Sequence, residues 1–423
     1  MLQISYLREN TTEAIERLLI KKFDSKELIK QILEHDDKRR QTQLELDNLF
    51  AESNRISKLI GELYKAGKKT EADDLKNHTI SIKQQSQELE KKLREIEDEI
   101  KQKLVLLPNT PSFSVPKGKS ADDNVVIYEN QTTVKIPENS LPHWDLAKKY
   151  DIIDFELGVK ITGAGFPVYK GKGARLQRGL INFFIDEALK KGYFEIQPPI
   201  LINEDSGFGT GQLPDKEGQM YHASIENFFL IPTAEVPITN IYRDVILREE
   251  DFPIKNVGYT PCFRREAGSY GKDVRGLNRL HQFDKVEIVQ ICHPENSYAI
   301  LEEMQNYVQS LLSKLGLKYR VLKLCGGDMG FASAFTYDME VYSAAQQKWL
   351  EVSSVSNFET FQSNRLKLRF KDKNGKTHLA HTLNGSALAL PRIVAALLEN
   401  NQTENGILMP DILIPYLGFD KIS

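Results

Sequence analysis

Arginines and carboxylates gather around one predicted β-hairpin, in the stretch FRREAGSYGKDVRGLNRLHQFDKVE. Its first limb carries Arg264 and Glu266, and its second carries Arg279, Phe283 and Glu287 at intervals of four residues. Because side chains alternate faces along a strand, each set would share one face of the hairpin. Arginine suits phosphate oxygens, an aromatic ring suits a base, and a carboxylate suits an ammonium or hydroxyl group. A solvent-exposed hairpin held by salt bridges would show the same charges, so this stretch alone leaves both interpretations open.

Two other segments carry oxygen ligands in short runs. In IPTAEVP, Thr233 and Glu235 stand two residues apart, so both would lie on one side of an extended segment. In LEVSSVSN, Glu351 stands near Ser353 and Ser354, a set of oxygen ligands that suits magnesium. Each pattern also fits an ordinary half-exposed strand.

A third segment, HTLNGSALALPRIVAALLEN, runs from a polar turn into an apolar helix. Pro391 fits the first turn of that helix, where a missing N–H costs little. Arg392 then lies near the helix start, where its charge opposes the helix dipole. An anionic ligand at this position would offset the repulsion, so the segment favours a binding site.

The composition is that of an ordinary globular protein. The 423 residues carry a net charge of −3, which neither favours nor excludes a nucleic-acid partner. The three cysteines, Cys262, Cys292 and Cys325, stand far apart, so we expect neither a disulfide framework nor a zinc site. The sequence begins without a signal-peptide pattern, and no apolar run approaches the ~18 residues of a membrane-spanning helix. We therefore expect a cytoplasmic protein with no membrane partner.

The N-terminal region predicts a long helical hairpin. Between about residues 28 and 105, apolar residues recur at heptad spacing in two runs that are separated by a turn at Gly67. Two antiparallel helices of about 35 residues would each extend about 50 Å. Such an arm could serve only for dimerisation, but its basic residues also favour contact with a nucleic-acid backbone. We expect that contact from these side chains: Arg39, Arg40, Arg55, Lys58, Lys65, Lys68, Lys69 and Lys76.

The remainder predicts an α+β domain. Three prolines and small polar residues in 107–124 indicate a linker between a helical arm, 1–106, and a main domain, 125–423. The GKS within this linker lacks the glycine that a phosphate loop requires, because that position holds Phe113. Strands and helices do not alternate regularly in the main domain, so an antiparallel sheet is favoured over a doubly wound one.

Taken together, these segments resemble the bacterial type of seryl-tRNA synthetase, a class II aminoacyl-tRNA synthetase. The resemblance covers essentially the whole chain and depends on GTGQLP, TAEVP, FRREAGS, HQFDKVE, GDMGF and TLNGSALA in this order. The three class II motifs would span about residues 173–199, 257–290 and 382–400. The resemblance implies an antiparallel catalytic domain with a coiled-coil arm, and a ligase that forms seryl-adenylate from serine and ATP before it charges tRNA(Ser).

The resemblance also implies a role for each residue of the site. Arg264 would bind the α-phosphate and the substrate carboxylate, Arg279 the γ-phosphate, and Arg392 would stack on adenine opposite Phe283. These three arginines would be catalytic, and the other ATP contacts would come from Arg265, Glu266, Phe283, Glu351, Val352, Ser353 and Ser354. The serine pocket would comprise Thr233, Ala234, Glu235, Arg264, Glu287, Asn384 and Ser386.

The implied cofactor is magnesium, bound together with ATP by Glu351 and Ser354. Strict alternation along a strand would instead place Ser353 beside Glu351, so this assignment requires a bulge. The implied partners are L-serine, tRNA(Ser) and a second copy of the chain, with tRNA(Sec) left open as a second acceptor.

Two alternatives remain. A threonyl-tRNA synthetase would hold zinc with Cys and His, and no matching set stands in these motifs. A non-catalytic paralogue usually lacks the arm or a motif arginine, and this sequence has both.

Overall fold

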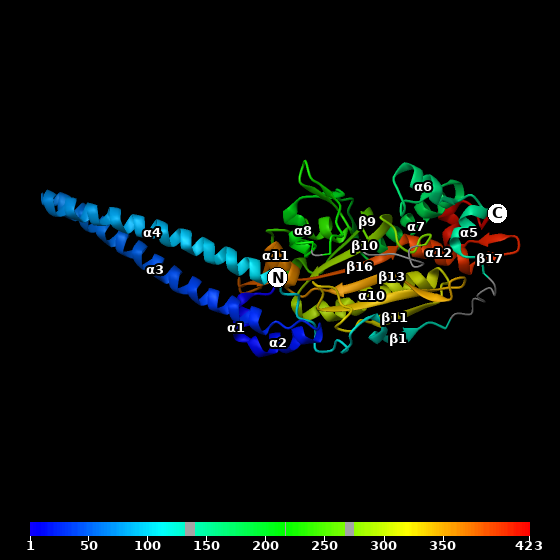
Figure 1. Ribbon diagram of the computed structural model, residues 1–423, viewed down its shortest axis with the longest axis horizontal. Helices are drawn as coiled ribbons and strands as arrows, with labels where there is room; N and C mark the ends of the chain where they lie inside the picture. Colours follow the sequence, from blue (N-terminus) through cyan, green and yellow to red (C-terminus); the bar gives the residue numbers. More distant parts are fainter. Residues whose placement is uncertain (132–139, 216, 267–274) are drawn as a thin grey trace. The chain divides into compact units, whose positions relative to one another are not determined.

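The chain is described by a computed structural model over these residues: 1–131, 140–215, 217–266 and 275–423 (Figure 1). Their contacts divide them into two compact units. A helical unit comprises residues 2–19 and 23–108, and a larger unit comprises residues 1, 20–22 and 109–423.

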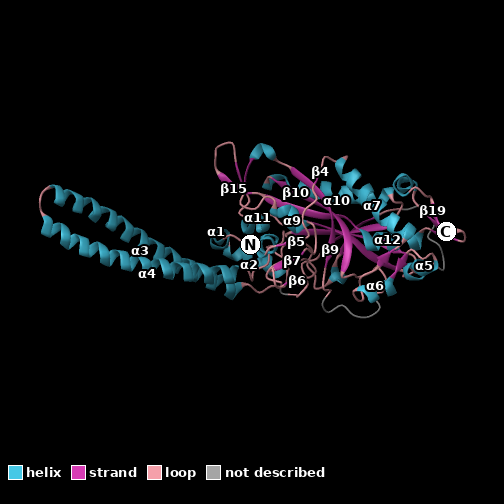
Figure 2. Ribbon diagram, turned by 90° about the horizontal axis from the view of Figure 1, so that it is seen from above, coloured by secondary structure: helices cyan, strands magenta, loops and turns pink. Residues whose placement is uncertain are grey.

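The helical unit is built around two long helices that lie side by side (Figure 2). Its helices are α1 (Ile4–Glu9), α2 (Thr11–Ile20), α3 (Lys26–Lys65) and α4 (Lys69–Leu104). The chain reverses at Gly67, whose φ of +74° favours glycine. Cross-helix contacts fix the antiparallel register: the Tyr64 hydroxyl donates to Asp73 at 2.7 Å, and His35 Nε2 lies 2.9 Å from Glu99 Oε2. The predicted coiled-coil hairpin is therefore confirmed.

The interior of this hairpin is mixed rather than purely apolar. Its buried apolar residues include Ile32, Leu46, Ile56, Ile82, Ile96 and Ile100. The carboxylate of Asp36 is also buried and accepts ion pairs from Arg8, Arg39 and Arg40 at 2.7, 2.9 and 2.9 Å. Because an unpaired buried carboxylate is costly, these arginines stabilise the base of the hairpin.

The larger unit is organised by a mostly antiparallel sheet. Among the described residues it has eight strands, in the order β1-β11-β12-β13-β16-β10-β9-β4. Their bounds are β1 Val125–Glu129, β4 Phe194–Glu195, β9 Ile254–Phe263, β10 Gln282–Cys292, β11 Tyr319–Lys323, β12 Phe335–Ser343, β13 Lys348–Asn357 and β16 His381–Ala389. The described pairings are antiparallel apart from β4 with β9. The expected α+β class with an antiparallel sheet is confirmed.

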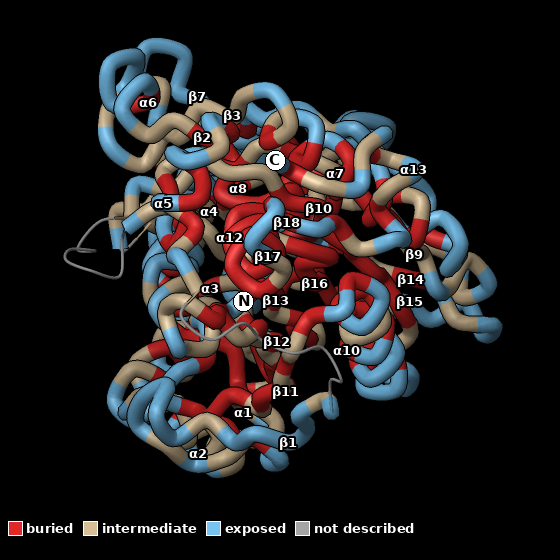
Figure 3. Tube along the Cα trace, turned by 90° about the vertical axis from the view of Figure 1, so that its right-hand side faces the viewer, coloured by how far each residue is buried: buried red, intermediate tan, exposed pale blue. Residues whose placement is uncertain are grey.

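Three helices pack on this sheet: α7 (Gly171–Leu189), α10 (Ser297–Lys314) and α12 (Leu390–Asn400). Residues of β10 on one face, Val286 and Ile288, belong to the main core together with Phe183 and Met304. Since side chains alternate, Glu287 faces the other way. The strand thus separates the core from a polar face, and Figure 3 shows the buried segments concentrated around β10, β12, β13, β16 and α12.

Shorter elements complete the larger unit. Its other helices are α5 (His143–Lys149), α6 (Phe155–Ile161), α8 (Glu204–Thr210), α9 (Glu235–Asn240), α11 (Phe361–Leu366) and α13 (Ile414–Leu417). The short 3₁₀ turns are η1 (Ala121–Asp123), η2 (Glu249–Asp251), η4 (Pro294–Asn296) and η5 (Asp411–Leu413). The minor strands are β2 (Ile153–Asp154), β3 (Val168–Tyr169), β5 (Leu201–Ile202), β6 (His222–Ala223), β7 (Phe228–Leu230), β8 (Ile246–Arg248), β14 (Arg369–Lys371), β15 (Thr377–Leu379), β17 (Gln402–Thr403), β18 (Gly406–Leu408) and β19 (Lys421–Ile422).

The segment that we expected to be a linker is anchored over much of its length. Asn109 is buried, and its side-chain amide donates to the carbonyls of Ala332 and Phe358 at 2.9 and 2.8 Å. Ser112 N donates to Ala334 O at 2.8 Å. Most of this segment therefore belongs to the larger unit.

Within the described ranges, no helix combines the length and apolarity needed to cross a bilayer.

Candidate active site

Arg264 lies just beyond the end of β9, beside the ring of Phe283 in β10. The backbone N of Arg264 donates to His281 O at 2.9 Å, which continues the pairing of the two strands. Its guanidinium carbon lies 5.3 Å from the centroid of the Phe283 ring. The expectation that Arg264 and Glu266 share a strand face is wrong, because the strand ends at Phe263 and Glu266 has a φ of +48°. Arg264 nevertheless remains next to the aromatic residue.

Glu266 and Arg279 form an ion pair across the base of the hairpin. Arg279 Nη1 lies 2.9 Å from Glu266 Oε2. Because β10 begins only at Gln282, Arg279 is not on the strand, and its predicted alignment with Phe283 by strand spacing is also wrong. The neighbouring Arg265 is fixed through its backbone N, which donates to Gln219 O at 2.8 Å. The eight residues between the two limbs, 267–274, lie outside the described residues.

A cluster of buried polar and acidic side chains, the predicted serine pocket, lies farther along the same face of β10. Glu287 pairs in register with Ser386 of β16, whose hydroxyl donates to Glu287 Oε2 at 3.4 Å. Lys285 Nζ lies 2.6 Å from the same oxygen. The exposed fractions of the Lys285 and Glu287 side chains are 6% and 2%. The pocket therefore contains a compensated carboxylate with unused acceptor capacity.

Glu235 supplies a second carboxylate, from the first residue of α9. The expected extended segment is wrong here, because the chain turns at Thr233, whose hydroxyl oxygen accepts a bond from Glu235 N at 3.2 Å. Gln362 Nε2 donates to Glu235 Oε1 at 2.6 Å. Burial, and then the nearby charge of Glu287, raise the pKa of Glu235 to about 7, against the opposing effects of Gln362, Lys285 and Asn384. A cationic group would bind well beside this carboxylate.

The other predicted pocket residues surround these carboxylates. Asn384 and Ser386 lie on β16, two residues apart, and both are 7% exposed. Ala234 is fully buried and packs with Ile238 and Val289. Its side chain forms part of the floor rather than a polar contact.

Sequence reasoning missed Lys285 and the support of Glu235. Lys285 stands two residues before Glu287, so strand alternation alone places it on the same face, and that signal was available. Gln362 in α11 gave no such signal. Its side chain is held by Thr382, whose hydroxyl donates to Gln362 Oε1 at 2.6 Å, and it reaches Glu235 only through the tertiary fold.

A bulge in β13 brings Glu351 and Ser354 to the same face. Opposite β12, Ser354 pairs with Asp338 and Glu351 pairs with Glu340, and the register shifts between these pairs. The bulge that the Ser354 assignment requires is therefore present. The side chains of Val352 and Ser353 are buried, and the Ser353 hydroxyl donates to Ser386 O at 2.6 Å. From these two residues we expect only backbone contacts with a ligand.

Oxygen-bearing side chains gather around this bulge. Glu351, Ser354 and Asp338 offer carboxylate and hydroxyl groups, the ligands that magnesium prefers, whereas Glu340 is ion-paired with Arg320. The described residues form no cluster of three or more acidic, histidine or cysteine side chains placed to hold a metal ion. Asp338 Oδ1 is buried and has no hydrogen-bond partner. Burial, and next the charge of Glu351, raise the pKa of Asp338 well above its ordinary value. An added cation would relieve this repulsion.

Arg392 lies in the first turn of α12. Pro391 precedes it at the helix start, as predicted. Arg392 Nε donates to Asn278 O at 3.0 Å, and Nη1 donates to Glu351 O at 2.7 Å. Three residues before Arg392, Ala389 pairs in register with Lys285 on β10. Arg392 therefore leaves the sheet at the end where Arg264 and Phe283 lie.

Comparison with known proteins identifies the family. Residues 221–401 match the tRNA synthetase class II core domain (G, H, P, S and T), and residues 1–111 match the seryl-tRNA synthetase N-terminal domain. The serine–tRNA ligase of Salinibacter ruber is 48% identical over 428 residues, covering 100% of this chain and 99% of that protein. That of Akkermansia muciniphila is 44% identical over 426 residues, with coverage of 100% and 99%.

A solved structure agrees in fold over the full length. The crystal structure of seryl-tRNA synthetase from Pyrococcus horikoshii complexed with ATP has a TM-score of 0.91 and 32% identity, covering 100% of this chain and 99% of that chain. Together with the antiparallel sheet and the helical hairpin, these matches establish that the chain belongs to the seryl-tRNA synthetases, the class II ATP-dependent ligases that join serine to tRNA.

Proposed function

We propose that the polar face of β10 holds ATP and serine side by side, so that the serine carboxylate can attack the α-phosphate. The observation that carries the proposal is the order of groups along this face. At one end, the guanidinium carbon of Arg264 lies 5.3 Å from the centroid of the Phe283 ring. The buried carboxylates of Glu235 and Glu287 follow. The arginine and the aromatic ring suit a nucleotide. The two carboxylates suit a small amino acid with an ammonium and a hydroxyl group.

The first step needs positioning and charge neutralisation more than a protein nucleophile. A carboxylate oxygen of serine forms a bond to the α-phosphorus, and the bond from that phosphorus to the bridging oxygen of pyrophosphate breaks. Arg264 would bind both the α-phosphate and the attacking carboxylate, and so stabilise the charge that develops between them. The 3′-terminal hydroxyl of tRNA then attacks the carbonyl carbon of seryl-adenylate, and AMP leaves.

The ion pair of Glu266 and Arg279 would open to receive the nucleotide. Glu266 would accept a hydrogen bond from the adenine amino group, and Arg279 would bind the γ-phosphate. Phe283 and Arg392 would hold the adenine ring between them, which suits the flat faces of a phenyl ring and a guanidinium. The backbone of residues 265 and 352–353 completes the proposed nucleotide contacts.

The two carboxylates would divide the recognition of serine. Glu235 would accept the ammonium group, whose charge offsets the repulsion from Glu287. Glu287 would accept a hydrogen bond from the substrate hydroxyl, with Asn384 and Ser386 alongside and Thr233 at the rim. Alanine lacks that hydroxyl and would leave the buried acceptor unpaired, which lowers its use by roughly 10⁴-fold.

Glu351 and Ser354 would hold magnesium together with ATP, with Asp338 and Glu340 facing them. When bound, magnesium would neutralise phosphate charge and orient the departing pyrophosphate. Glu351 also helps to position Arg392, because its backbone carbonyl accepts a hydrogen bond from Arg392 Nη1.

The edge of the main sheet supports a homodimer. Phe194 in β4 is 71% exposed, and Leu189 and Leu201 nearby in the sequence are 44% and 46% exposed. Large apolar side chains exposed at a sheet edge favour a covered interface. Leu189 and Phe194 belong to motif 1, and Leu201 follows it directly, so we propose that two copies pair through this segment. A cytoplasmic location suits the three cysteines, which are free and buried.

The helical hairpin would bind tRNA(Ser) by shape and backbone charge. Of the eight cations expected there, Arg39 and Arg40 are engaged by Asp36, and Lys68 lies 3.0 Å from Glu71 Oε1. The others, Arg55, Lys58, Lys65, Lys69 and Lys76, are exposed. We therefore propose the distal half of the hairpin as the tRNA contact.

Pyrophosphate exchange into ATP, driven by a panel of amino acids, tests the proposal. Serine should support exchange, while threonine and alanine should support it far less. Exchange driven best by threonine would favour a threonyl enzyme instead. No exchange with any amino acid, from a folded protein, would favour a non-catalytic paralogue.

A further inference from the structure

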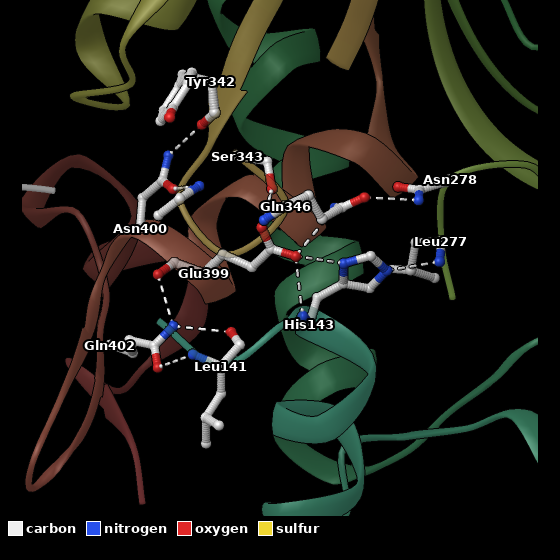
Figure 4. Close-up of polar contacts among 11 residues, drawn as sticks. Leu141, His143, Leu277, Asn278, Tyr342, Ser343, Gln346, Glu399, Asn400 and Gln402 are labelled. Carbon is white, nitrogen blue, oxygen red and sulfur yellow. Dashed lines mark hydrogen bonds and ion pairs between the residues drawn. The ribbon is translucent and has the colours of Figure 1, made fainter. Parts of the chain in front are cut away.

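A buried histidine–glutamate pair joins α5 to α12 (Figure 4). His143 opens α5, Glu399 lies in the last turn of α12, and both side chains are fully buried. His143 Nδ1 lies 2.7 Å from Glu399 Oε1, and its backbone N donates to the same oxygen at 3.0 Å. Gln346 Nε2 also donates to Oε1, at 3.1 Å, and the Ser343 hydroxyl donates to Oε2. Both oxygens of Glu399 therefore accept hydrogen bonds.

The second ring nitrogen of His143 accepts a hydrogen bond. The backbone N of Leu277 donates to His143 Nε2 at 2.8 Å. A backbone N–H can only donate, so Nε2 carries no proton and Nδ1 carries the one that is donated to Glu399. The pair therefore holds one tautomer, with its acceptor aimed at the segment that follows the hairpin connection.

That segment, residues 275–279, is called the return limb. The guanidinium carbon of Arg275 lies 4.6 Å from the centroid of the Trp144 ring. Gly276 packs so closely on His143 that a Cβ at this position would stand 2.2 Å from His143 Nε2. Its φ of +66° also requires glycine. In the limb, successive residues are thus fixed by stacking, close packing and a hydrogen bond to α5.

The limb carries one arginine of the site and contacts a second, Arg392 of α12. Asn278 Nδ2 donates to Gln346 Oε1 at 2.8 Å, and Asn278 O accepts from Arg392 Nε at 3.0 Å. The next residue, Arg279, is the partner of Glu266. A connected set of hydrogen bonds therefore runs from Glu399 through Gln346 and Asn278 to Arg392. Leu277, which is bonded to His143, is separated from Arg279 by one residue.

We propose that His143 is a positioning residue: with Glu399 it fixes the return limb, and so sets Arg279 and Arg392 for the nucleotide. The inference rests on the proposed function of those arginines. It predicts an effect on ATP and not on serine, because the contacts of the serine pocket come from β10, β16, α9 and α11 rather than from this limb. His143 itself would touch no reacting atom.

Two substitutions separate the bonds of the ring. In His143→Asn, the amide can replace Nδ1 and donate to Glu399, but it leaves Leu277 N without its acceptor. In His143→Gln, the longer amide can present its oxygen where Nε2 stood. We expect His143→Asn to raise KM for ATP in pyrophosphate exchange about tenfold or more, as for one lost buried hydrogen bond, with KM for serine unchanged. His143→Gln should recover most of this loss.

Matched glycine variants test the same contact from the side of the limb, with His143 and Glu399 themselves unchanged in the sequence. Gly276→Ala would place a Cβ against His143, whereas Gly375→Ala, at a similar φ of +77°, meets no atom within 4 Å. We expect the first to raise KM for ATP and the second not to. This comparison also decides the question if His143→Asn fails to fold.

The outcomes distinguish the inference from the proposed function. Absence of serine-driven exchange by the wild-type protein would reject the proposed function. Normal exchange by the wild type, with an unchanged KM for ATP in folded His143→Asn and in Gly276→Ala, would overturn the inference. A lower melting temperature with equal losses for ATP and serine would assign the pair a structural role only, and would overturn it too.

Discussion

Lys285 Nζ lies 2.6 Å from Glu287 Oε2, and the two side chains are 6% and 2% exposed. A buried ion pair of this kind gains its value from mutual compensation, because each charge would be costly alone. The pair also lies in the pocket where Glu235 holds a pKa raised by burial and by Glu287. Lys285 therefore keeps two carboxylates within one small volume.

Replacing Lys285 with methionine should damage both stability and serine binding. The free energy of unfolding should fall by about 3 kcal/mol, since Glu287 would be left without its partner. KM for serine in pyrophosphate exchange should rise at least about tenfold, because the Glu287 carboxylate would lose the ion pair that holds it in place. Lys91→Met, which breaks an exposed pair with Glu95, should change neither quantity. An unaltered KM for serine would argue against this role of Lys285.

Glu235 gives stability a pH dependence of defined sign. Its pKa is raised from an ordinary value of 4.5 to about 7, so the folded state binds a proton that the unfolded state has released. The resulting stabilisation is present below pH 4.5 and is lost as the pH rises through 7. Glu235→Gln does not titrate and should be more stable than the wild type at pH 8, by up to about 3 kcal/mol, with little difference at pH 4.5.

Urea unfolding of both proteins at the two pH values measures this difference. Glu226→Gln, at an exposed carboxylate, serves as the control and should show no pH-dependent difference. A constant gap between Glu235→Gln and the wild type across this range would count against the raised pKa. Glu235→Gln should also lose serine-driven exchange, because a neutral amide cannot offset the positive charge of the substrate ammonium group.

Much of this arrangement follows from local patterns in the sequence. Heptad spacing on either side of Gly67 predicted the helical hairpin, and period-two alternation predicted that Phe283 and Glu287 would share one face of their strand, which is β10. Pro391 marked the start of α12 correctly. These signals are reliable because they depend on which face of an element is buried, a property that each segment carries by itself.

The errors arise where the chain leaves regular structure. Thr233 and Glu235 were expected on an extended segment, but the chain turns there and Glu235 begins a helix. Arg264 and Arg279 stand outside the strands that were expected to carry them. The contact of Gln362 with Glu235 joins residues far apart in sequence, so no local pattern could predict it. Strand ends, turns and tertiary contacts are set by the whole fold.

Arg264→Ala should nearly abolish adenylate formation without unfolding the protein. Toward the described residues, the Arg264 side chain donates one long hydrogen bond, from Nε to Pro232 O at 3.4 Å, and stacks on Phe283, so little stability depends on it. Loss of a group that binds developing charge typically lowers the rate by about 10²- to 10³-fold. Arg264→Lys should recover little, because lysine lacks the planar fork. Exchange at the wild-type rate in either variant would remove Arg264 from the mechanism. Arg369→Ala, on β14, is the control and should keep the wild-type rate.

Shortening the helical hairpin should separate serine activation from tRNA charging. Removing residues 45–90 and closing the gap with a short turn keeps the base of the hairpin, where Asp36 binds three arginines and His35 meets Glu99. Serine-driven exchange should then stay within about twofold of the wild type, because every group proposed to bind ATP or serine lies in the larger unit. Charging of tRNA should fall at least tenfold, since backbone contacts provide much of the affinity.

Charge reversal tests the same surface without shortening the hairpin. In the double variant Arg55→Glu and Lys58→Glu, charging should weaken and its dependence on salt should become shallower, because fewer phosphate contacts would release counterions. The same reversal at Lys373 and Lys376, in the exposed turn between β14 and β15, should leave both activities unchanged. If charging by the shortened and the charge-reversed proteins equals that of the wild type, the distal half of the hairpin does not bind tRNA. The alternative of a purely dimerising arm would then be favoured, and sedimentation of the shortened protein as a monomer would identify it.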